Sequence, residues 1–212
     1  MNRQRILLAS GNPGKLAELC RLSGGLPVDI YGPESLENGL PHVEETGSSF
    51  LENAVIKALS AADEAVANGE DDWALADDSG LVVDFLDGAP GVRSARFAGT
   101  QGEGRDLANN ALLLEKMEGV PPEGRQASFW CVLALARPGQ VLLAVEGSVE
   151  GRILDAPRGK GGFGYDPLFF HVPSDRTFAE LEPEEKAAIS HRSMAMTRLR
   201  AALEALVPQE TA

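Results

Sequence analysis

The chain has 212 residues, of which 43% are hydrophobic and 24% charged, so we expect a soluble globular protein with a substantial core. Its net charge of −13 argues against a surface that coats nucleic acid and against a polybasic membrane patch. The two cysteines are far apart, and the first apolar run is too short for a signal peptide or a membrane span. We therefore expect a cytoplasmic protein that binds neither nucleic acid nor membranes.

Strand-like and helix-like segments alternate along the chain. Apolar runs predict strands at residues 6–9, 28–31, 73–76, 81–86, 127–136 and 141–149. Helical spacing of apolar residues predicts helices at residues 16–22, 49–65, 107–117 and 190–206. This interleaving predicts an α/β fold in a single domain over residues 1–212, and the adjacent strands 127–136 and 141–149 indicate a mixed sheet.

The first candidate for chemistry is Asp77-Asp78-Ser79-Gly80, which lies between two apolar runs. Gly80 predicts a sharp turn there. Two adjacent carboxylates at a strand end suit a divalent cation such as Mg²⁺, which takes few protein carboxylates and keeps its waters. The alternative is a solvated turn with capping aspartates, because Asp is favoured in turns.

The second candidate is the glycine-rich turn from Ser10 to Lys15, between a predicted strand and a predicted helix. Such turns present backbone N–H groups to phosphate, and Lys15 adds a mobile positive charge. The spacing of Gly11 and Gly14, and Leu16 after the lysine, exclude a Walker A loop. An ordinary strand–helix turn is the alternative.

Glu44 and Glu45 precede the helix predicted at 49–65, which Ser48 or Ser49 can cap. These carboxylates can hold metal, or they can simply complement the positive end of the helix. Farther along the same helix, Lys57 points either into a ligand site or into solvent, where most lysines lie.

The third and fourth candidates lie in the last quarter of the chain. Phe163 begins the segment Phe163-Gly164-Tyr165-Asp166-Pro167, and an aromatic ring beside a glycine can stack on a nucleobase. A turn before a strand with buried aromatics is the alternative. Lys186 is followed by the segment Ser190-His191-Arg192, whose basic residues would occupy a helix N-terminus that is already positive. This misfit indicates a nearby anion or electron-rich ring, unless the charges are merely solvated. Together these motifs supply the groups that a nucleoside triphosphate site needs.

These motifs also occur in the order and spacing of a known family. They are SGNPGK (10–15), EETG (44–47), FLENA (50–54), ADDSGL (76–81), GAPGVRSARF (88–97), GGFGYDPLF (161–169) and EKAAISHR (185–192). On these residues the chain resembles the inosine/xanthosine triphosphate pyrophosphatases, the Ham1-like hydrolases that remove deaminated purines from the nucleotide pool. The resemblance runs from Ile6 to about Leu206.

The resemblance implies an elongated α/β fold of the ITPase-like type, with a central mixed sheet, flanking helices and two lobes around a nucleotide-binding cleft. It implies a homodimer. It also implies Mg²⁺-dependent hydrolysis of purine nucleoside triphosphates that carry hypoxanthine or xanthine (ITP, dITP and XTP), giving the monophosphate and pyrophosphate.

Roles for individual residues follow from the resemblance and the chemistry of phosphoryl transfer. Asp78 is expected to be the general base and a metal contact, with Glu44 as second metal ligand; Glu45 and Asp77 remain rivals. Ser79 is expected to donate to a substrate oxygen. The polyphosphate is assigned to Ser10, Gly11, Asn12, Pro13, Gly14 and Lys15, with Lys57 and Lys186 as further cations. The base or sugar is assigned to Phe163, Gly164, Tyr165, Asp166, His191 and Arg192.

Two rival functions use the same residues. A phosphotransferase would use Lys15 and the paired aspartates, but the absence of Ser or Thr after Lys15 and of a Walker B pattern argues against it. A non-catalytic nucleotide-binding regulator would keep Lys15 and Phe163 and would have no need for Asp78.

Overall fold

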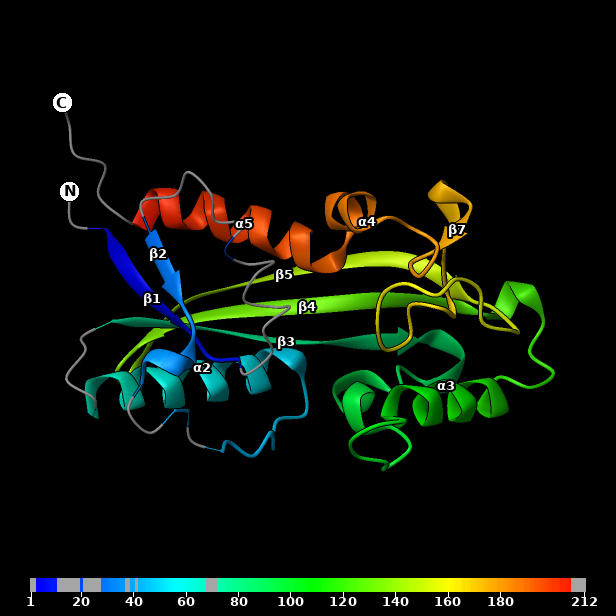
Figure 1. The fold of residues 1–212 in the computed structure, drawn as a ribbon, viewed down its shortest axis with the longest axis horizontal. Coiled ribbons are helices and arrows are strands. Elements are labelled where there is room, and N and C mark those ends of the chain that lie inside the picture. Colours follow the sequence, from blue (N-terminus) through cyan, green and yellow to red (C-terminus); the bar gives the residue numbers. More distant parts are fainter. Residues whose placement is uncertain are drawn as a thin grey trace. The chain divides into compact units, whose positions relative to one another are not determined.

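The computed structural model describes residues 3–10, 20, 28–36, 39–40, 42–67 and 72–206. Its strands form one sheet in the order β2-β1-β3-β4-β5-β6-β7 (Figure 1). β1 pairs in parallel with β2 and β3, whereas β6 pairs antiparallel with β5 and β7. The strands span Gln4–Leu8 (β1), Val28–Tyr31 (β2), Trp73–Val83 (β3), Gln126–Arg137 (β4), Gln140–Ile153 (β5), Phe169–His171 (β6) and Arg176–Thr177 (β7). The predicted α/β class and mixed sheet are confirmed.

Helices flank this sheet and span Phe50–Ala67 (α2), Arg105–Lys116 (α3), Pro183–Ile189 (α4) and His191–Leu206 (α5). α5 packs Leu199 against Ile6 of β1 in one buried cluster, and the alanines of α2 pack with Leu7 of β1 in another. Because successive strand residues point to opposite faces, α2 and α5 cover opposite faces of β1, as Figure 1 shows.

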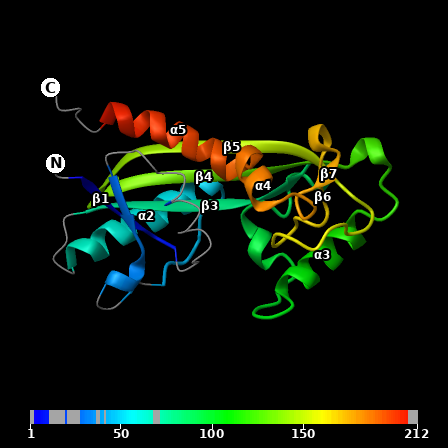
Figure 2. The same ribbon diagram turned by 45° about the horizontal axis from the view of Figure 1, so that its top comes forward.

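Two compact units divide the chain: residues 1–78, 131–147 and 193–212 form unit 1, and residues 79–130 and 148–192 form unit 2. The clusters around β1 are the core of unit 1. Unit 2 has its own core, in which Phe129, Phe169 and Phe178 contact one another with ring centroids 4.5 to 5.8 Å apart. α3, α4, β6 and β7 of unit 2 gather around it (Figure 2).

The start of α2 follows the capping prediction. The backbone N–H of Glu52 donates to Ser49 Oγ at 3.2 Å, so Ser49 satisfies one of the free donors of the first turn. The Glu52 carboxylate accepts from the backbone N–H of Ser48 at 2.6 Å. The small residues predicted to share one helical face are buried, namely Ala54, Ala58, Ala61, Ala62 and Ala65.

The predicted turn at Asp77-Asp78-Ser79-Gly80 is wrong. β3 is one continuous strand of 11 residues, and both Asp77 and Asp78 are buried in the middle of it, so the alternative of a solvated turn is wrong as well. Gly80 serves close packing instead of a turn, because a Cβ there would lie 2.4 Å from Ser94 Oγ. β3 then ends at Val83, and the 3-10 helix Asp84–Leu86 replaces the end of the strand predicted at 81–86.

The other predicted boundaries hold within a few residues. β4 and β5 match the strands predicted at 127–136 and 141–149, α3 matches the helix at 107–117, and α5 that at 190–206. The separate helix α4 was not predicted. The helix predicted at 16–22 lies outside the described residues, apart from Cys20. None of the helices in the described part of the chain has the length and apolar character that crossing a membrane requires.

Candidate functional site

A buried ion-pair cluster in unit 1 surrounds Asp78. Lys57 of α2 donates from Nζ to Asp78 Oδ1 at 2.8 Å and to Glu45 Oε1 at 2.9 Å. Asn53 donates from Nδ2 to Asp78 Oδ2 at 3.3 Å. Both carboxylate oxygens of Asp78 therefore have a donor, which fixes the orientation of the carboxylate.

Helical spacing explains how two of these side chains meet the carboxylate. Asn53 and Lys57 are four residues apart on α2, so they lie on the same face of the helix. Asn53 Oδ1 also accepts from the backbone N–H of Gly47 at 2.8 Å, which holds the segment containing Glu45 against the start of the helix. Lys57 therefore does not point into solvent, and that alternative is wrong.

The electrostatics of this cluster are dominated by burial. Burial raises the pKa of Asp78, and the nearby Glu45 carboxylate adds to the rise, while Lys57 and Asn53 only partly oppose it. Burial by itself would lower the pKa of Lys57, but the carboxylates of Asp78 and Glu45 outweigh it, so this pKa is raised. The site thus pairs a permanently charged lysine with a carboxylate that takes up a proton more readily than an exposed aspartate does.

The two glutamates before α2 have different surroundings. Glu45 is the one that meets Lys57, whereas Glu44 is exposed and its carboxylate makes no hydrogen bond or ion pair within the described part of the chain. Asp77 points to the opposite face of β3 from Asp78, because strand side chains alternate. The carboxylate of Asp78 is a group of the kind that Mg²⁺ takes, because this ion binds through one or two protein carboxylates together with waters and substrate phosphates. Within residues 3–10, 20, 28–36, 39–40, 42–67 and 72–206, no group of three or more acidic, His or Cys side chains could hold a metal ion.

Only Ser10 of the predicted phosphate turn, residues 10–15, lies among the described residues. Leu8 of β1 is in register with Leu75 of β3, and Ala9 N–H donates to Leu75 O at 2.8 Å. Ser10 therefore leaves the sheet beside the strand that carries Asp78. The other predicted phosphate ligands, Gly11, Asn12, Pro13, Gly14 and Lys15, lie outside the described residues.

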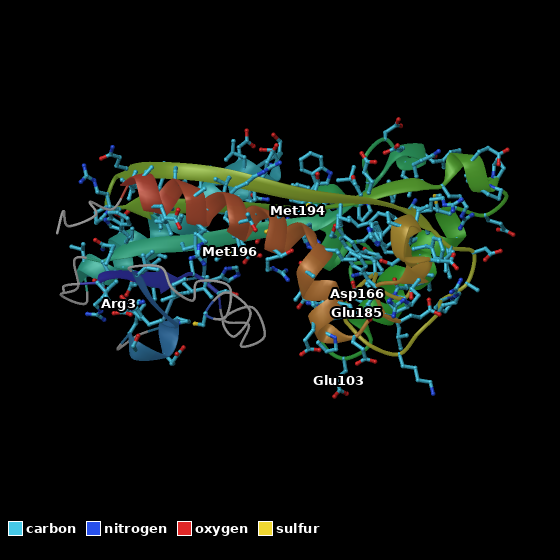
Figure 3. The ribbon with its side chains drawn as sticks, turned by 90° about the horizontal axis from the view of Figure 1, so that it is seen from above. Arg3, Glu103, Asp166, Glu185, Met194 and Met196 are labelled. Carbon is cyan, nitrogen blue, oxygen red and sulfur yellow. The ribbon has the colours of Figure 1, made fainter. Side chains whose placement is uncertain are left out.

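A second cluster, in unit 2, surrounds Asp166. Lys186 of α4 forms an ion pair with Asp166 Oδ2 and lies 4.6 Å from the centroid of the Phe163 ring. Asp166 is labelled in Figure 3, together with Glu185 of α4. The backbone N–H of Phe163 donates to Asp166 Oδ2 at 2.8 Å. The Phe163 ring is 58% exposed. The alternative, a turn before a strand with buried aromatics, also describes this segment, because the turn leads into β6 with its buried Phe169 and Phe170. Burial raises the pKa of Asp166, and Lys186 opposes the rise.

The loop that carries Phe163 is held by α3. Gly164 N–H donates to Asp106 Oδ2 at 2.8 Å, and Asn110 Nδ2 donates to Gly164 O at 2.9 Å. Tyr165 is buried, and its hydroxyl donates to Ser94 O at 2.9 Å. Sequence reasoning missed Asp106 and Asn110. Asp106 lies just before the helix predicted at 107–117. Its spacing of four residues from Asn110 indicates at most a shared helical face and does not point to a glycine more than fifty residues away.

The remaining predicted residues flank these clusters. His191 and Arg192 begin α5 and are buried, so the alternative of solvated charge is wrong. The His191 ring stacks on Phe129, with centroids 5.0 Å apart and planes 16° from parallel. Ser79 follows Asp78 on β3 and is partly exposed.

Known proteins resemble the chain over nearly its whole length. The model of the Ham1 family matches residues 6–202. A dITP/XTP pyrophosphatase of Geobacter sulfurreducens is 48% identical over 92% of this chain and 94% of its own, and one of Frankia alni is 49% identical over 92% and 95%. A HAM1 protein structure from Coxiella burnetii matches with a TM-score of 0.85 and 43% identity, covering 95% of this chain and 99% of its own. The chain belongs to the Ham1 family.

Proposed function

We propose that this protein hydrolyses dITP, ITP and XTP between the α and β phosphates, with Mg²⁺ as cofactor. The observation that carries the proposal is the buried Asp78, whose two carboxylate oxygens are each held by a side chain of α2. Relatives at 48–49% identity are dITP/XTP pyrophosphatases, which supports the substrate class.

In this mechanism Asp78 takes the proton of the attacking water. The water oxygen forms the new bond to the α phosphorus, the bond from that phosphorus to the bridging oxygen breaks, and pyrophosphate leaves. Asn53 and Lys57 keep the Asp78 carboxylate in one orientation, and the ammonium of Lys57 adds positive charge where phosphate charge accumulates. Asp78 and Glu44 would hold Mg²⁺, which would neutralise phosphate charge and lower the pKa of the water.

The Asp166 cluster binds the base in this proposal. The exposed ring of Phe163 stacks on the purine, with Lys186 packed against its other side. His191 and Arg192 are the donors for the 6-oxo group or the sugar. A site built to donate to a 6-oxo group rejects adenine, because a buried donor left without an acceptor costs about 1–3 kcal/mol.

Three further parts of the proposal rest on the family resemblance, and the first and third of them also on the sequence features described above. They are a single domain that includes both units, a homodimer and a cytoplasmic location. Sedimentation of the purified protein tests the homodimer, which would have twice the chain mass of 22.5 kDa.

Pyrophosphate release from ITP, XTP, dITP, GTP and ATP with Mg²⁺ tests the function directly. Asp78→Asn should abolish turnover, whereas the exposed Asp84→Asn, just beyond the end of β3, is the matched control and should keep it. Equal turnover of GTP and ITP would contradict the substrate assignment. Release of inorganic phosphate would contradict the cleavage position, and an unchanged rate for Asp78→Asn would remove Asp78 from the mechanism.

A further inference from the structure

Unit 2 contains a cavity of about 340 Å³ whose lining includes none of the residues assigned above to substrate or metal. Arg125 just before β4, Arg152 on β5 and Arg158 after β5 contribute guanidinium groups to it. Val120 and Phe170 are among the apolar residues of its wall. A volume of this size is within the range of about 300–1,000 Å³ that small-molecule sites have.

Arg125 places a buried positive charge at this cavity. Its side chain is 9% exposed, and its guanidinium donates to the backbone carbonyls of Met117, Val120, Ile153 and Leu154 at 2.7 to 3.2 Å. These four bonds use four of the five guanidinium N–H groups. Among the described residues no carboxylate pairs with Arg125. Its donors are therefore largely satisfied while its charge is not neutralised, which favours an anion nearby.

Two more guanidinium groups share one aromatic ring at the cavity. Arg152 lies 5.7 Å and Arg158 5.5 Å from the centroid of the Phe170 ring. Glu180 pairs with Arg158 at 3.0 Å, but Arg152 forms no ion pair within the described part of the chain. Asp155 is the one acidic residue of the lining and pairs with none of the three arginines in the described structure. Three guanidinium groups against the two carboxylates of Asp155 and Glu180 leave one excess positive charge at the cavity, in a chain whose net charge is −13.

We propose that this cavity is a second anion site, which binds the phosphate group of a small phosphorylated molecule. Guanidinium groups match phosphate oxygens with paired N–H donors, and Arg152 offers such a pair. Glu180 occupies Nε and Nη2 of Arg158, so Arg158, the other guanidinium beside the Phe170 ring, contributes its Nη1 donors. The buried charge of Arg125 adds attraction that solvent screens little. Val120 and the neighbouring apolar wall provide contact area for the rest of the ligand.

The Nε–H signals of the arginines in proton–nitrogen correlation spectra report binding at this cavity without any turnover. The signal that is missing from the spectrum of Arg152→Gln belongs to Arg152, and the signal missing from that of Arg158→Gln belongs to Arg158. The full-length protein is titrated with inorganic phosphate and, separately, with inosine 5′-monophosphate, each against chloride at the same ionic strength. The two arms separate free phosphate from a nucleotide as the source of the phosphate group. Arg137→Gln is the matched control, because Arg137 is exposed, pairs with Gln140 alone among the described residues and does not line the cavity.

We expect the Arg152 and Arg158 signals to shift saturably with phosphate. Inosine 5′-monophosphate should bind more tightly than phosphate, because its nucleoside contacts the apolar wall. Arg152→Gln should weaken binding at the Arg158 signal by about tenfold, because it removes charge-assisted hydrogen bonds, whereas Arg137→Gln should not. No shift, equal shifts with chloride, or unchanged affinity in Arg152→Gln would overturn the proposal. Hydrolysis of ITP by Arg152→Gln should match that of the wild type, so failure of this proposal is distinguishable from failure of the proposed function.

Discussion

Replacing Lys57 with methionine is the sharpest test of the Asp78 cluster. The substitution keeps a long apolar side chain on α2 and removes the ammonium that Asp78 and Glu45 share. At an effective dielectric constant of about 20, a pair of unit charges at the 2.8 Å separation of Lys57 Nζ and Asp78 Oδ1 interacts by about 6 kcal/mol. Desolvation of the ammonium offsets part of this attraction.

The net loss of stability depends on the two carboxylates, of Asp78 and Glu45, that the substitution leaves without their shared cation. Removing one partner of a fully buried pair costs about 3–5 kcal/mol. The side chains of Lys57 and Glu45 are 17% and 27% exposed, so solvent screens part of the repulsion between the two remaining carboxylates. We expect the free energy of unfolding at neutral pH to fall by about 2–4 kcal/mol in urea titrations. Lys116→Met, at an exposed lysine of α3, is the control and should change it by less than about 1 kcal/mol.

The same variant should shift the pH dependence of pyrophosphate release toward alkaline pH. Lys57 is the main group that lowers the pKa of Asp78 against the effect of burial, so its removal raises that pKa further. Glu45→Gln should shift the profile in the opposite direction, because it removes a carboxylate that raises the pKa of Asp78. A stability loss below about 1 kcal/mol, or shifts of the same sign in both variants, would refute the reasoning.

Three other substitutions test single contacts. Asp106→Ala removes the acceptor of the Gly164 N–H and should raise KM for ITP several-fold with a smaller effect on kcat, which steady-state kinetics measures. Gly80→Ala would bring a Cβ within 2.7 Å of the Gly91 carbonyl oxygen, so we expect a loss of about 1–3 kcal/mol in thermal unfolding, and an unchanged Tm would contradict the packing. Burial lowers the pKa of His171 below its ordinary 6.5, so the neutral ring stabilises the fold above that pH and this stability is lost as the pH falls. His171→Gln should thus lose less stability than the wild type on acidification from neutral pH, and equal losses in urea titrations would argue against the shift.

Local sequence signals determined most of the elements. The strand at 28–31, the capped helix with its alanine face and the paired strands 127–136 and 141–149 are present near the predicted bounds. These features follow from periodicity, capping and short turns, which act between residues close in sequence. The family motifs were equally readable, because they are defined by residue type and spacing alone.

The surroundings of the candidate residues needed the tertiary structure. The residues Asp77, Asp78 and Gly80 have the composition of a turn, but they lie within one continuous strand. Gly80 leaves room for Ser94, which packs where a side chain on residue 80 would lie. Spacing could not tell Glu44 from Glu45, and only the fold of the segment before α2 brings Glu45 to Lys57.

The sequence by itself determined the fold class, the family and the set of residue types available for chemistry. Only the tertiary structure decided that Asp78 is buried with a lysine and an amide on its two oxygens, and that α3 holds the Phe163 loop through Gly164. The physical reason is that burial and long-range hydrogen bonds, which set pKa values and orientations, join residues whose separation along the chain carries no pattern.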